Sequence, residues 1–578
     1  MRPPRIPRLP LASRPPARRA PRVSRGASVG RARRAPRTPR AVTVLLAALL
    51  CALGTASAAH AVRPASAPAS APASLPGSTA GTVRGLLDGH THIEGADDMG
   101  GRMICGEPFD PDGIAAALHD CADHYPNGEL AVFENFLKNG TPLGTHDPIG
   151  WPTFRDWPAH DSLTHQQVYY TWLERAWKGG LRIIVDQYVA NRVLCELYPL
   201  KKNPCDEDAT IDLEHGKAVR MQDYIDSLNG GPGKGWFRIV RTPEEARTVA
   251  ASGKLAVVEG IETSEPFGCR EIRDVPQCTE KQIDAGLDHM QAQGVSTMFV
   301  CHKFDNALCG VRMDGGTGGV AVNLGNLVGT GHFWDVRTCT GPAHDNTVTP
   351  QVTLPAAVTS ALGLPNLPAP LYPAAPHCNT RGLTALGAYM VKQMIKRKMI
   401  IQIDHMSVKA ADQTLTLLEQ AHYPGVISSH SWTDPGFYER IYRLGGMITE
   451  YGSPADQFAG GWRTAKQAFQ QAGGQGLFGF GYGLDANGFG KLPAPRAGGD
   501  VQYPFTALSG VTLDRLRTGL RTWDVNADGV ANYGLVPDWI EDIRKTDGPE
   551  LTGDLANGAE AYLRMWERTA AYTPPSTP

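Results

Sequence analysis

Histidine and acidic residues recur along the chain in types that could bind metal ions. The residues are His90, His92, Glu259, His302, His405, His430 and Asp485. Imidazole and carboxylate groups are the ligands that divalent transition metals such as zinc accept. Singly, each has an ordinary structural explanation, because a buried histidine is more often a hydrogen-bonded core residue than a ligand. Gathered on one face, they predict a metal site.

Short apolar runs, bounded by Gly, Pro or charged residues, must position these side chains. The runs cover 82–90, 181–187, 254–260, 296–302, 398–405, 425–430, 445–451 and 476–485. Segments with helical periodicity separate several of them, most clearly 385–398 and 410–421, and 536–568 reads as two further helices. Eight strands joined in this way predict a (β/α)8 TIM barrel with long loop insertions.

The seven candidate residues follow these predicted strands closely. Six of the eight runs end in one of them, or in the pair His90 and His92. Barrel enzymes carry their catalytic groups at the carboxyl ends of strands, so this placement supports a catalytic site. Glu262 could compete with Glu259 as a ligand, but it follows the predicted strand end by three residues and is expected in the loop.

Several stretches of the chain resemble the renal or membrane dipeptidases of peptidase family M19, within the wider amidohydrolase group. The similar stretches are LLDGHTH, LAVVEGIE, MFVCHKFDN, RGLTALGAYMVKQMIKRKMIIQIDHMS, PGVISSHS and GFGYGLDANG. The resemblance runs over most of 85–568. It implies hydrolysis of an amide bond, with a dipeptide or related small peptide as substrate.

The resemblance also implies a role for each candidate residue. His90, His92 and Glu259 would hold one metal ion, and Glu259, His405 and His430 the other, with Glu259 as the bridge. His302 would contact the substrate, and Asp485 would transfer protons. Two divalent cations, with zinc as the first choice, would share a water and lower its pKa, leaving a bridging hydroxide as the nucleophile.

Two departures from the family pattern affect the substrate more than the metals. The dipeptidases usually have HxD on the first strand, whereas this chain has HxH at His90 and His92. The family's substrate-binding arginine has no unambiguous counterpart; Arg440 is our candidate and Arg443 the alternative. A helix-surface charge explains either arginine equally well.

Two other functions fit the same residues. The site could hydrolyse another amide, an ester or a lactone. Alternatively, the chain could be a catalytically inactive surface binding protein on a barrel scaffold, with the loop-rich insert 303–378 as its interaction surface. The insert follows the fourth predicted strand, which places it over the expected active-site face.

The beginning of the chain predicts export. The first 40 residues contain 13 Arg and no acidic residue, and the apolar run 41–54 follows. We therefore expect a signal peptide over 1–61, a Pro/Ala/Ser-rich linker over 62–80 and one barrel domain over 81–575, in a secreted or extracytoplasmic protein. The apolar run is too short for a stable membrane span, which needs about 20 residues.

Charge and cysteine content agree with this expectation. Removing the leader's 13 Arg from the 56 basic residues leaves 43 against 58 acidic ones, a net charge of about −15, which argues against nucleic-acid binding. Ten cysteines remain outside the leader, and disulfides are expected. Spacing favours Cys195–Cys205, Cys269–Cys278 and Cys301–Cys309. Pairing Cys105–Cys121 and Cys339–Cys378 is one arrangement of the other four.

Overall fold

The computed structural model describes residues 81–349 and 370–575. The predicted signal peptide over 1–61, the linker over 62–80 and part of the insert, 350–369, lie outside the described residues. All described residues belong to one compact unit, residues 67–578.

The central element is a ring of parallel strands. The strands are β1 (Leu86–Thr91), β2 (Leu181–Ala190), β4 (Leu255–Thr263), β7 (Thr297–Phe299), β10 (Ile400–Gln402), β11 (Val426–Ser428), β12 (Met447–Tyr451) and β13 (Gly481–Gly483). Each pairs with the next, and pairing of β13 with β1 closes the ring. A closed eight-stranded parallel ring with helices between strands is a (β/α)8 barrel. Each predicted run overlaps one of these strands, so the fold prediction is confirmed.

The structure adds a strand that the sequence analysis did not predict. β3 (Phe237–Val240) pairs with the first half of β4, from Leu255 to Val258. Arg238 interrupts the apolar pattern of its four residues, FRIV, so the strand has no continuous apolar run. β3 therefore lies outside the ring of eight without changing its order.

Alternation along the strands separates the inside of the barrel from its helix-covered outside. On β4, Ala256 and Val258 join an apolar cluster with Ile183 and Val185 of β2, whereas Val257 and Ile261 join the larger cluster with the surrounding helices. Successive strand side chains point to opposite faces, so even-numbered residues of β4 face the interior. This parity decides which acidic residue of β4 reaches the site.

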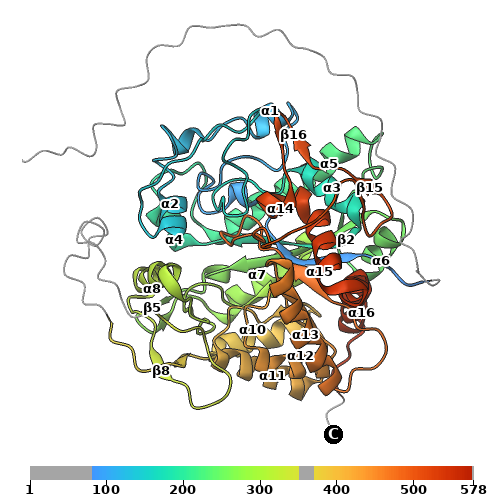
Figure 1. Ribbon diagram of the computed structural model, residues 1–578. Helices are drawn as coiled ribbons and strands as arrows, with labels where there is room; N and C mark the ends of the chain where they lie inside the picture. Colours follow the sequence, from blue (N-terminus) through green and yellow to red (C-terminus); the bar gives the residue numbers. More distant parts are fainter. Residues whose placement is uncertain (1–80, 350–369, 576–578) are drawn as a thin grey trace, which may run out of the picture. The chain divides into compact units, whose positions relative to one another are not determined.

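Helices surround the ring. They are α3 (Tyr170–Gly179), α5 (Glu207–Leu228), α6 (Pro243–Ala251), α7 (Glu280–Gln293), α10 (Ala385–Lys396), α11 (Val408–Ala421), α12 (Tyr438–Leu444), α13 (Ala455–Gln471), α15 (Val536–Ala556) and α16 (Gly558–Ala570). Figure 1 shows α10 to α13 gathered on one flank, and α15 with α16 on another. The helices predicted over 385–398, 410–421 and 536–568 correspond to α10, α11 and the pair α15 and α16. Gly548, with φ of 80°, interrupts α15 just before Pro549.

Shorter elements lie in the connections. They are α1 (Ile114–Ala117), α2 (Val132–Asn139), α4 (Arg192–Leu197), α8 (Gly316–Thr330), α14 (Val525–Asp528), and the two-stranded sheets β5–β6 (271–272, 275–276), β8–β9 (336–338, 377–379), β14–β15 (505–506, 512–513) and β16–β17 (517–518, 521–522). The segment between β1 and α3 contains only short helices. α8 belongs to the predicted insert.

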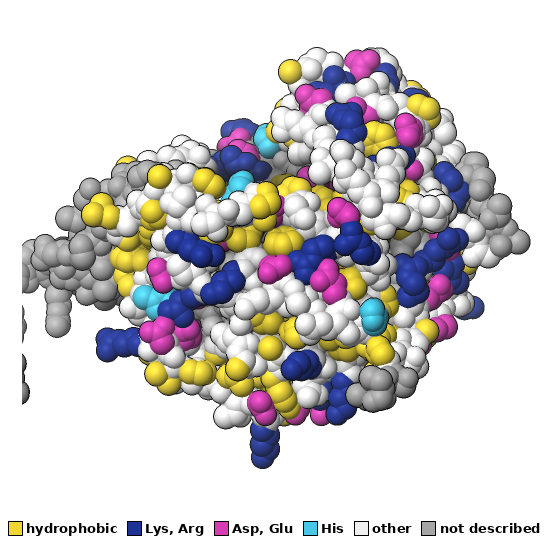
Figure 2. Space-filling view, turned by 90° about the horizontal axis from the view of Figure 1, so that it is seen from below, with side chains coloured by type: hydrophobic (Ala, Val, Ile, Leu, Met, Phe, Trp, Pro, Cys, Tyr) yellow, Lys and Arg dark blue, Asp and Glu magenta, His cyan; other side chains and the backbone are white. Residues whose placement is uncertain are grey.

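Covalent links tie several of these connections together. The structure contains all five proposed disulfides: Cys105–Cys121, Cys195–Cys205, Cys269–Cys278, Cys301–Cys309 and Cys339–Cys378. Disulfides at this density are typical of an extracytoplasmic protein. Within the described residues, no helix has both the length and the apolar character to cross a membrane. Figure 2 shows acidic and basic side chains interspersed among apolar and neutral groups on one face.

Candidate metal centre

The length of β4 determines which glutamate enters the barrel. β4 continues to Thr263, four residues beyond Glu259, and every residue in it is buried. Glu259 and Glu262 are three residues apart, so they point to opposite faces of the strand. Glu262 has the even-numbered, interior position, and its side chain is 2% exposed.

The structure therefore places Glu262, and not Glu259, among the candidate histidines. Glu259 points outward, where the Tyr188 hydroxyl donates a 2.5 Å hydrogen bond to it and His215 Nδ1 lies 2.8 Å away. The structure therefore does not bring Glu259, the predicted shared ligand, into either group of potential ligands. Alternation counted along LAVVEGIET, with the strand extended by four residues, would have found Glu262.

Glu262 lies between two groups of potential ligands. On one side, its Oε2 is 3.3 Å from His90 Nε2 and 3.4 Å from His92 Nε2, and Asp485 completes the group. On the other side, its Oε1 is 3.2 Å from His405 Nε2, and His430 completes the group. One carboxylate thus contacts both groups, each of which has at least three potential ligand atoms within 4.8 Å of one another.

The strand ends supply these residues in different ways. The pairing of β1 with β2 shifts register between Asp88 and Thr91, where the HxH pair begins. His405 and Asp485, just beyond β10 and β13, have left-handed backbones with φ of 65° and 52°. Such conformations cost about 1–3 kcal/mol in non-glycine residues and cluster at functional sites. The backbone is thus locally strained at His405 and Asp485, where it directs their side chains into the barrel.

Hydrogen bonds on the outer ring nitrogens fix the tautomers of two histidines. His92 Nδ1 donates to the carbonyl oxygen of Gln187 at 2.6 Å, and His430 Nδ1 lies 3.2 Å from Asp404 Oδ2. Since a carbonyl and a carboxylate can only accept, both Nδ1 atoms carry protons, and Nε2 is the atom of each ring that faces the other potential ligands. A metal ion would bind these two rings through Nε2.

Asp404 holds the ends of two neighbouring strands together. It follows β10, and it accepts hydrogen bonds from the backbone N–H of Ser429 at 2.6 Å and of His430 at 3.0 Å, both just beyond β11. The Ser428 hydroxyl donates to its other oxygen at 2.6 Å. Asp404 thereby positions His430 without entering the group of ligands.

The spacing of the inner nitrogens fits a metal site. His90 Nε2 and His92 Nε2 are 3.2 Å apart, and His405 Nε2 and His430 Nε2 are 3.0 Å apart. Two nitrogens bound tetrahedrally to one zinc at about 2.05 Å would lie about 3.3 Å apart. The donor set of imidazoles and carboxylates, and their spacing, therefore suit divalent zinc.

Burial and mutual charge shift the pKa values across this cluster. Burial alone would lower the pKa of His90, but the Glu262 and Asp485 carboxylates outweigh it and raise that pKa to about 10. Burial would raise the pKa of Glu262, yet the surrounding histidines hold it well below its usual range. Burial lowers the pKa of His302 to about 3, so that ring is neutral. The cluster concentrates negative charge where cations would bind.

His302 and Asp485 both reach the cluster, at opposite sides of Glu262. His302 Nε2 is 3.6 Å from Glu262 Oε1, and its Nδ1 is buried without a hydrogen-bond partner in the part of the chain described. Asp485 Oδ1 is 3.1 Å from His92 Nε2 and 3.6 Å from His90 Nε2. Asp485 is thus placed both to bind a metal and to exchange protons.

The proposed substrate arginine lies elsewhere. Arg440 on α12 forms ion pairs with Glu419 at 2.7 Å and Asp412 at 2.6 Å on the outer helical layer. The alternative, Arg443, pairs with Glu439 on its own helix and is 59% exposed. Neither lines the cavity above the cluster. The choice of Arg440 is therefore not supported, and its helix-surface explanation describes the structure.

A cavity of about 310 Å³ opens above the candidate metal centre. His302, His405, His430 and Asp485 form its floor, and its walls are largely apolar and come from α2, α4, α8 and the loop after β13. Lys303 also lines it, with Nζ 3.2 Å from Asp314 Oδ1 and 4.9 Å from the Trp432 ring centre. Neither Lys303 nor Trp432 was among the predicted site residues, although Lys303 directly follows His302 and Trp432 lies two residues after His430.

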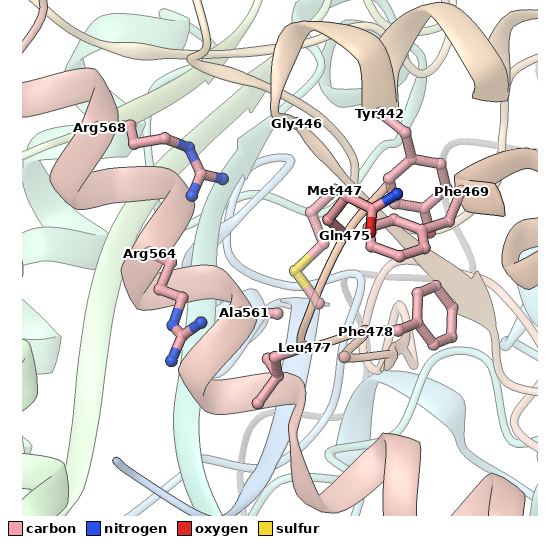
Figure 3. Close-up of a pocket in the computed structure, with 11 residues that line it drawn as sticks. Tyr442, Gly446, Met447, Phe469, Gln475, Leu477, Phe478, Ala561, Arg564 and Arg568 are labelled. Atoms are coloured by element: carbon pink, nitrogen blue, oxygen red, sulfur yellow. The ribbon is translucent and has the colours of Figure 1, made fainter. Parts of the chain in front are cut away.

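A second hollow lies at the opposite end of the strands (Figure 3). Arg564 and Arg568 of α16 line one side, and the rings of Tyr442, Phe469 and Phe478 line the other. Its strand residue, Met447, begins β12, which places this pocket at the amino end of the barrel. It contains none of the predicted site residues, so the carboxyl end is the candidate active face.

Comparison with known proteins gives distant likenesses. No family model and no curated protein matches the chain. A metallopeptidase from Rhodobacter sphaeroides, solved with a phosphinate mimic of the dipeptide L-Ala-D-Ala, is 12% identical with a TM-score of 0.40, covering 84% of this chain and 99% of its own. An amidohydrolase from Pseudomonas aeruginosa is 12% identical with a TM-score of 0.37, and the match covers 70% of this chain and 93% of that protein. A probable dipeptidase from the same organism is 15% identical with a TM-score of 0.37, and the match covers 70% of this chain and 89% of that protein. Likenesses this distant carry no argument about activity.

Proposed function

We propose that this protein is an exported, binuclear metal-dependent hydrolase that cleaves an amide bond, most readily in a dipeptide. The observation that carries the proposal is the position of Glu262 between two groups of ligands, one with His90 and His92 and the other with His405 and His430. A binding protein has no evident use for two adjacent ligand groups that share a buried carboxylate at the base of a cavity.

Each residue has a definite task in the proposed reaction. When bound, two divalent cations would lower the pKa of a water molecule and polarise the scissile carbonyl. Asp485 lies beside that centre and can accept the water's proton and return it to the leaving amine. His302 is neutral, so one ring nitrogen can donate a hydrogen bond to the oxygen that becomes negative during attack.

The cavity limits the substrate. A volume of about 310 Å³ suits a small molecule, and the apolar walls favour a dipeptide with apolar side chains. With Arg440 on the outer layer, Lys303 is our replacement candidate for the group that binds the substrate's terminal carboxylate. Release of Lys303 from Asp314 would accompany such binding.

The experiment that tests this proposal measures release of amino acids from L,L and L,D dipeptides by zinc-loaded protein, beside Asp485→Asn. We expect hydrolysis by the wild type and a loss of at least about 100-fold in the variant, the usual contribution of a general acid–base. Silence on dipeptides with activity on other amides, esters or lactones would keep the site and change the substrate. Two bound metals with no hydrolysis of dipeptides, other amides, esters or lactones would overturn the proposed enzymatic function and favour a binding protein.

A further inference from the structure

Three histidines form a separate cluster in the segment between β1 and α3. His124 ends a short 3-10 helix, His146 lies in a loop, and His165 forms an isolated bridge with Cys105. His124 and His165 are buried, and His146 is half-buried. Each offers a ring nitrogen, and the three atoms lie within 4.8 Å of one another. None of the three lines the cavity above the candidate metal centre.

The three rings surround a common point. Their centres are 5.4 Å (His124–His146), 4.8 Å (His124–His165) and 5.0 Å (His146–His165) apart, and their planes cross at 86°, 77° and 87°. Edge-to-face packing of buried rings also produces such angles, so the angles alone do not decide. The nitrogen lone pairs decide between packing and ligation.

The disulfide beside His165 fixes its tautomer. His165 Nδ1 lies 3.2 Å from Sγ of Cys121, which is bonded to Cys105 and has no proton to give. Nδ1 is therefore the donor, and the lone pair of His165 is on Nε2. This is the tautomer that a metal ligand needs, and an outer-nitrogen contact of this kind is how proteins orient metal-binding histidines.

The lone pair of His165 faces groups that a cation would satisfy. Nε2 of His165 is 3.5 Å from Glu134 Oε2 and 3.2 Å from His146 Nε2. The backbone and hydroxyl of Thr164 both donate to Glu134 Oε2, at 3.1 and 2.5 Å, which holds the carboxylate in place. A carboxylate and an imidazole lone pair do not attract each other unless a cation or a shared proton lies between them.

The third histidine has an unused nitrogen. Nδ1 of His124 is buried and has no hydrogen-bond partner among the described residues. A buried nitrogen without a hydrogen-bond partner is destabilising unless a ligand or a water molecule satisfies it.

We propose that His124, His146 and His165 bind a third divalent metal ion of the zinc type, separate from the candidate active site. Three imidazoles, with the Glu134 carboxylate to balance charge, match zinc's ligand preferences. The 3.2 Å between His146 Nε2 and His165 Nε2 is close to the roughly 3.3 Å of two nitrogens on one tetrahedral zinc.

The location suggests what this ion does. The histidines come from three places in a segment with only short helices, where Cys105–Cys121 is the described covalent link. A metal held by all three would fasten that segment much as a disulfide does. The segment also supplies Met99 and Phe133 to the cavity wall. The ion would therefore stabilise one wall of the candidate active site without taking part in the chemistry.

Zinc stoichiometry after dialysis against a zinc buffer tests the proposal with three proteins. His146→Ala removes the half-buried ligand, which makes it the variant with the smallest packing cost, and His119→Ala is the matched control, because His119 is in the same segment and 62% exposed. We expect His146→Ala to bind one equivalent less than wild type and His119→Ala to equal wild type. Equal zinc content in all three proteins would overturn the proposal. A hydrogen bond from Nε2 of His146 to Nε2 of His165 would then explain the 3.2 Å contact between them.

The same comparison in a Glu262→Gln background makes the result independent of the proposed active site. There we expect Co²⁺ to give tetrahedral absorption bands that are weaker in His146→Ala and unchanged in His119→Ala. Bands of equal strength in the two variants would contradict the third site. Gel filtration and circular dichroism show whether each variant is folded, so that a lost equivalent of metal can be assigned to the lost ligand. His146→Asn replaces His146→Ala if the latter does not fold.

Discussion

The choice between Glu262 and Glu259 shows how much depends on the position of a single residue. Both are buried glutamates on β4, three residues apart, and only strand parity separates them. Glu262 contacts four of the candidate histidines, whereas Glu259 contacts Tyr188 and His215.

Glu262→Gln should therefore disable the centre, and Glu259→Gln should spare it. Replacing one oxygen of the shared carboxylate removes a ligand and a negative charge, so we expect less bound metal and a fall in kcat/KM of about 100-fold or more. Metal analysis and kinetics of both variants check this. Equal losses in the two variants would contradict the assignment of Glu262 as the shared ligand.

Lys303 and Arg440 offer a similar pair for the substrate carboxylate. Lys303→Ala should raise KM about tenfold, the value of one charge-assisted hydrogen bond of about 1.4 kcal/mol, with a smaller effect on kcat. Arg440→Ala should leave both constants unchanged and cost at most about 1 kcal/mol of stability, since it removes partly exposed ion pairs. A raised KM in Arg440→Ala alone would restore the original assignment.

Glu450 on β12 gives a prediction about pH. Burial raises the pKa of Glu450 to about 7. The Ser431 hydroxyl donates a hydrogen bond of 3.2 Å to the carboxylate, which lowers the pKa by less than burial raises it. Because the folded-state pKa exceeds the unfolded value, the unfolded chain releases this proton first, and the stability penalty grows as pH rises from about 4.5 to about 7. Below that window the penalty is absent.

Glu450→Gln should remove this penalty. We expect the variant to gain about 1–3 kcal/mol over wild type in urea unfolding at pH 8 and nothing at pH 4. Glu439→Gln is a suitable control, because Glu439 is 40% exposed and paired only within its own helix. A gain that is the same at both pH values would contradict the pKa argument.

At the scale of elements, the sequence reveals which strands exist but not where each ends. Apolar runs between turn residues identified all eight barrel strands, since burial on both faces of a parallel sheet leaves continuous apolar stretches. The same continuity hides alternation, which is why the end of β4 was placed too early and Glu262 was assigned to a loop. Arg440 failed for a different reason: the sequence does not show which way a helix face turns.

Asp404 is the element-scale feature that the site depends on most. Its carboxylate joins the end of β10 to the first residues after β11, so Asp404→Asn would weaken three hydrogen bonds and free the ring of His430. We expect a 10- to 100-fold loss of zinc affinity, as for other residues that orient ligands. Competition with a chromophoric chelator measures it. Unchanged affinity would mean that packing alone orients His430.

For the whole molecule, the ligands come from β1, β4 and the residues that follow β10, β11 and β13, so bound metals would connect opposite sides of the barrel. Ions that bind the folded but not the unfolded chain stabilise it by about 4 kcal/mol when their concentration is about 1,000 times Kd. The unbound cluster, by contrast, keeps buried carboxylates and imidazoles crowded together.

Chelation should therefore lower the melting temperature by several degrees, and zinc should restore it. Glu262→Gln should lose most of that response, because the ligand shared by the two groups is gone. His146→Ala should lose a smaller part, and the two losses should add in the double variant. Scanning calorimetry of the four proteins, wild type, each single variant and the double variant, separates the two contributions. A full response to zinc in the double variant would place the stabilising ion at neither site, and would overturn both proposals together.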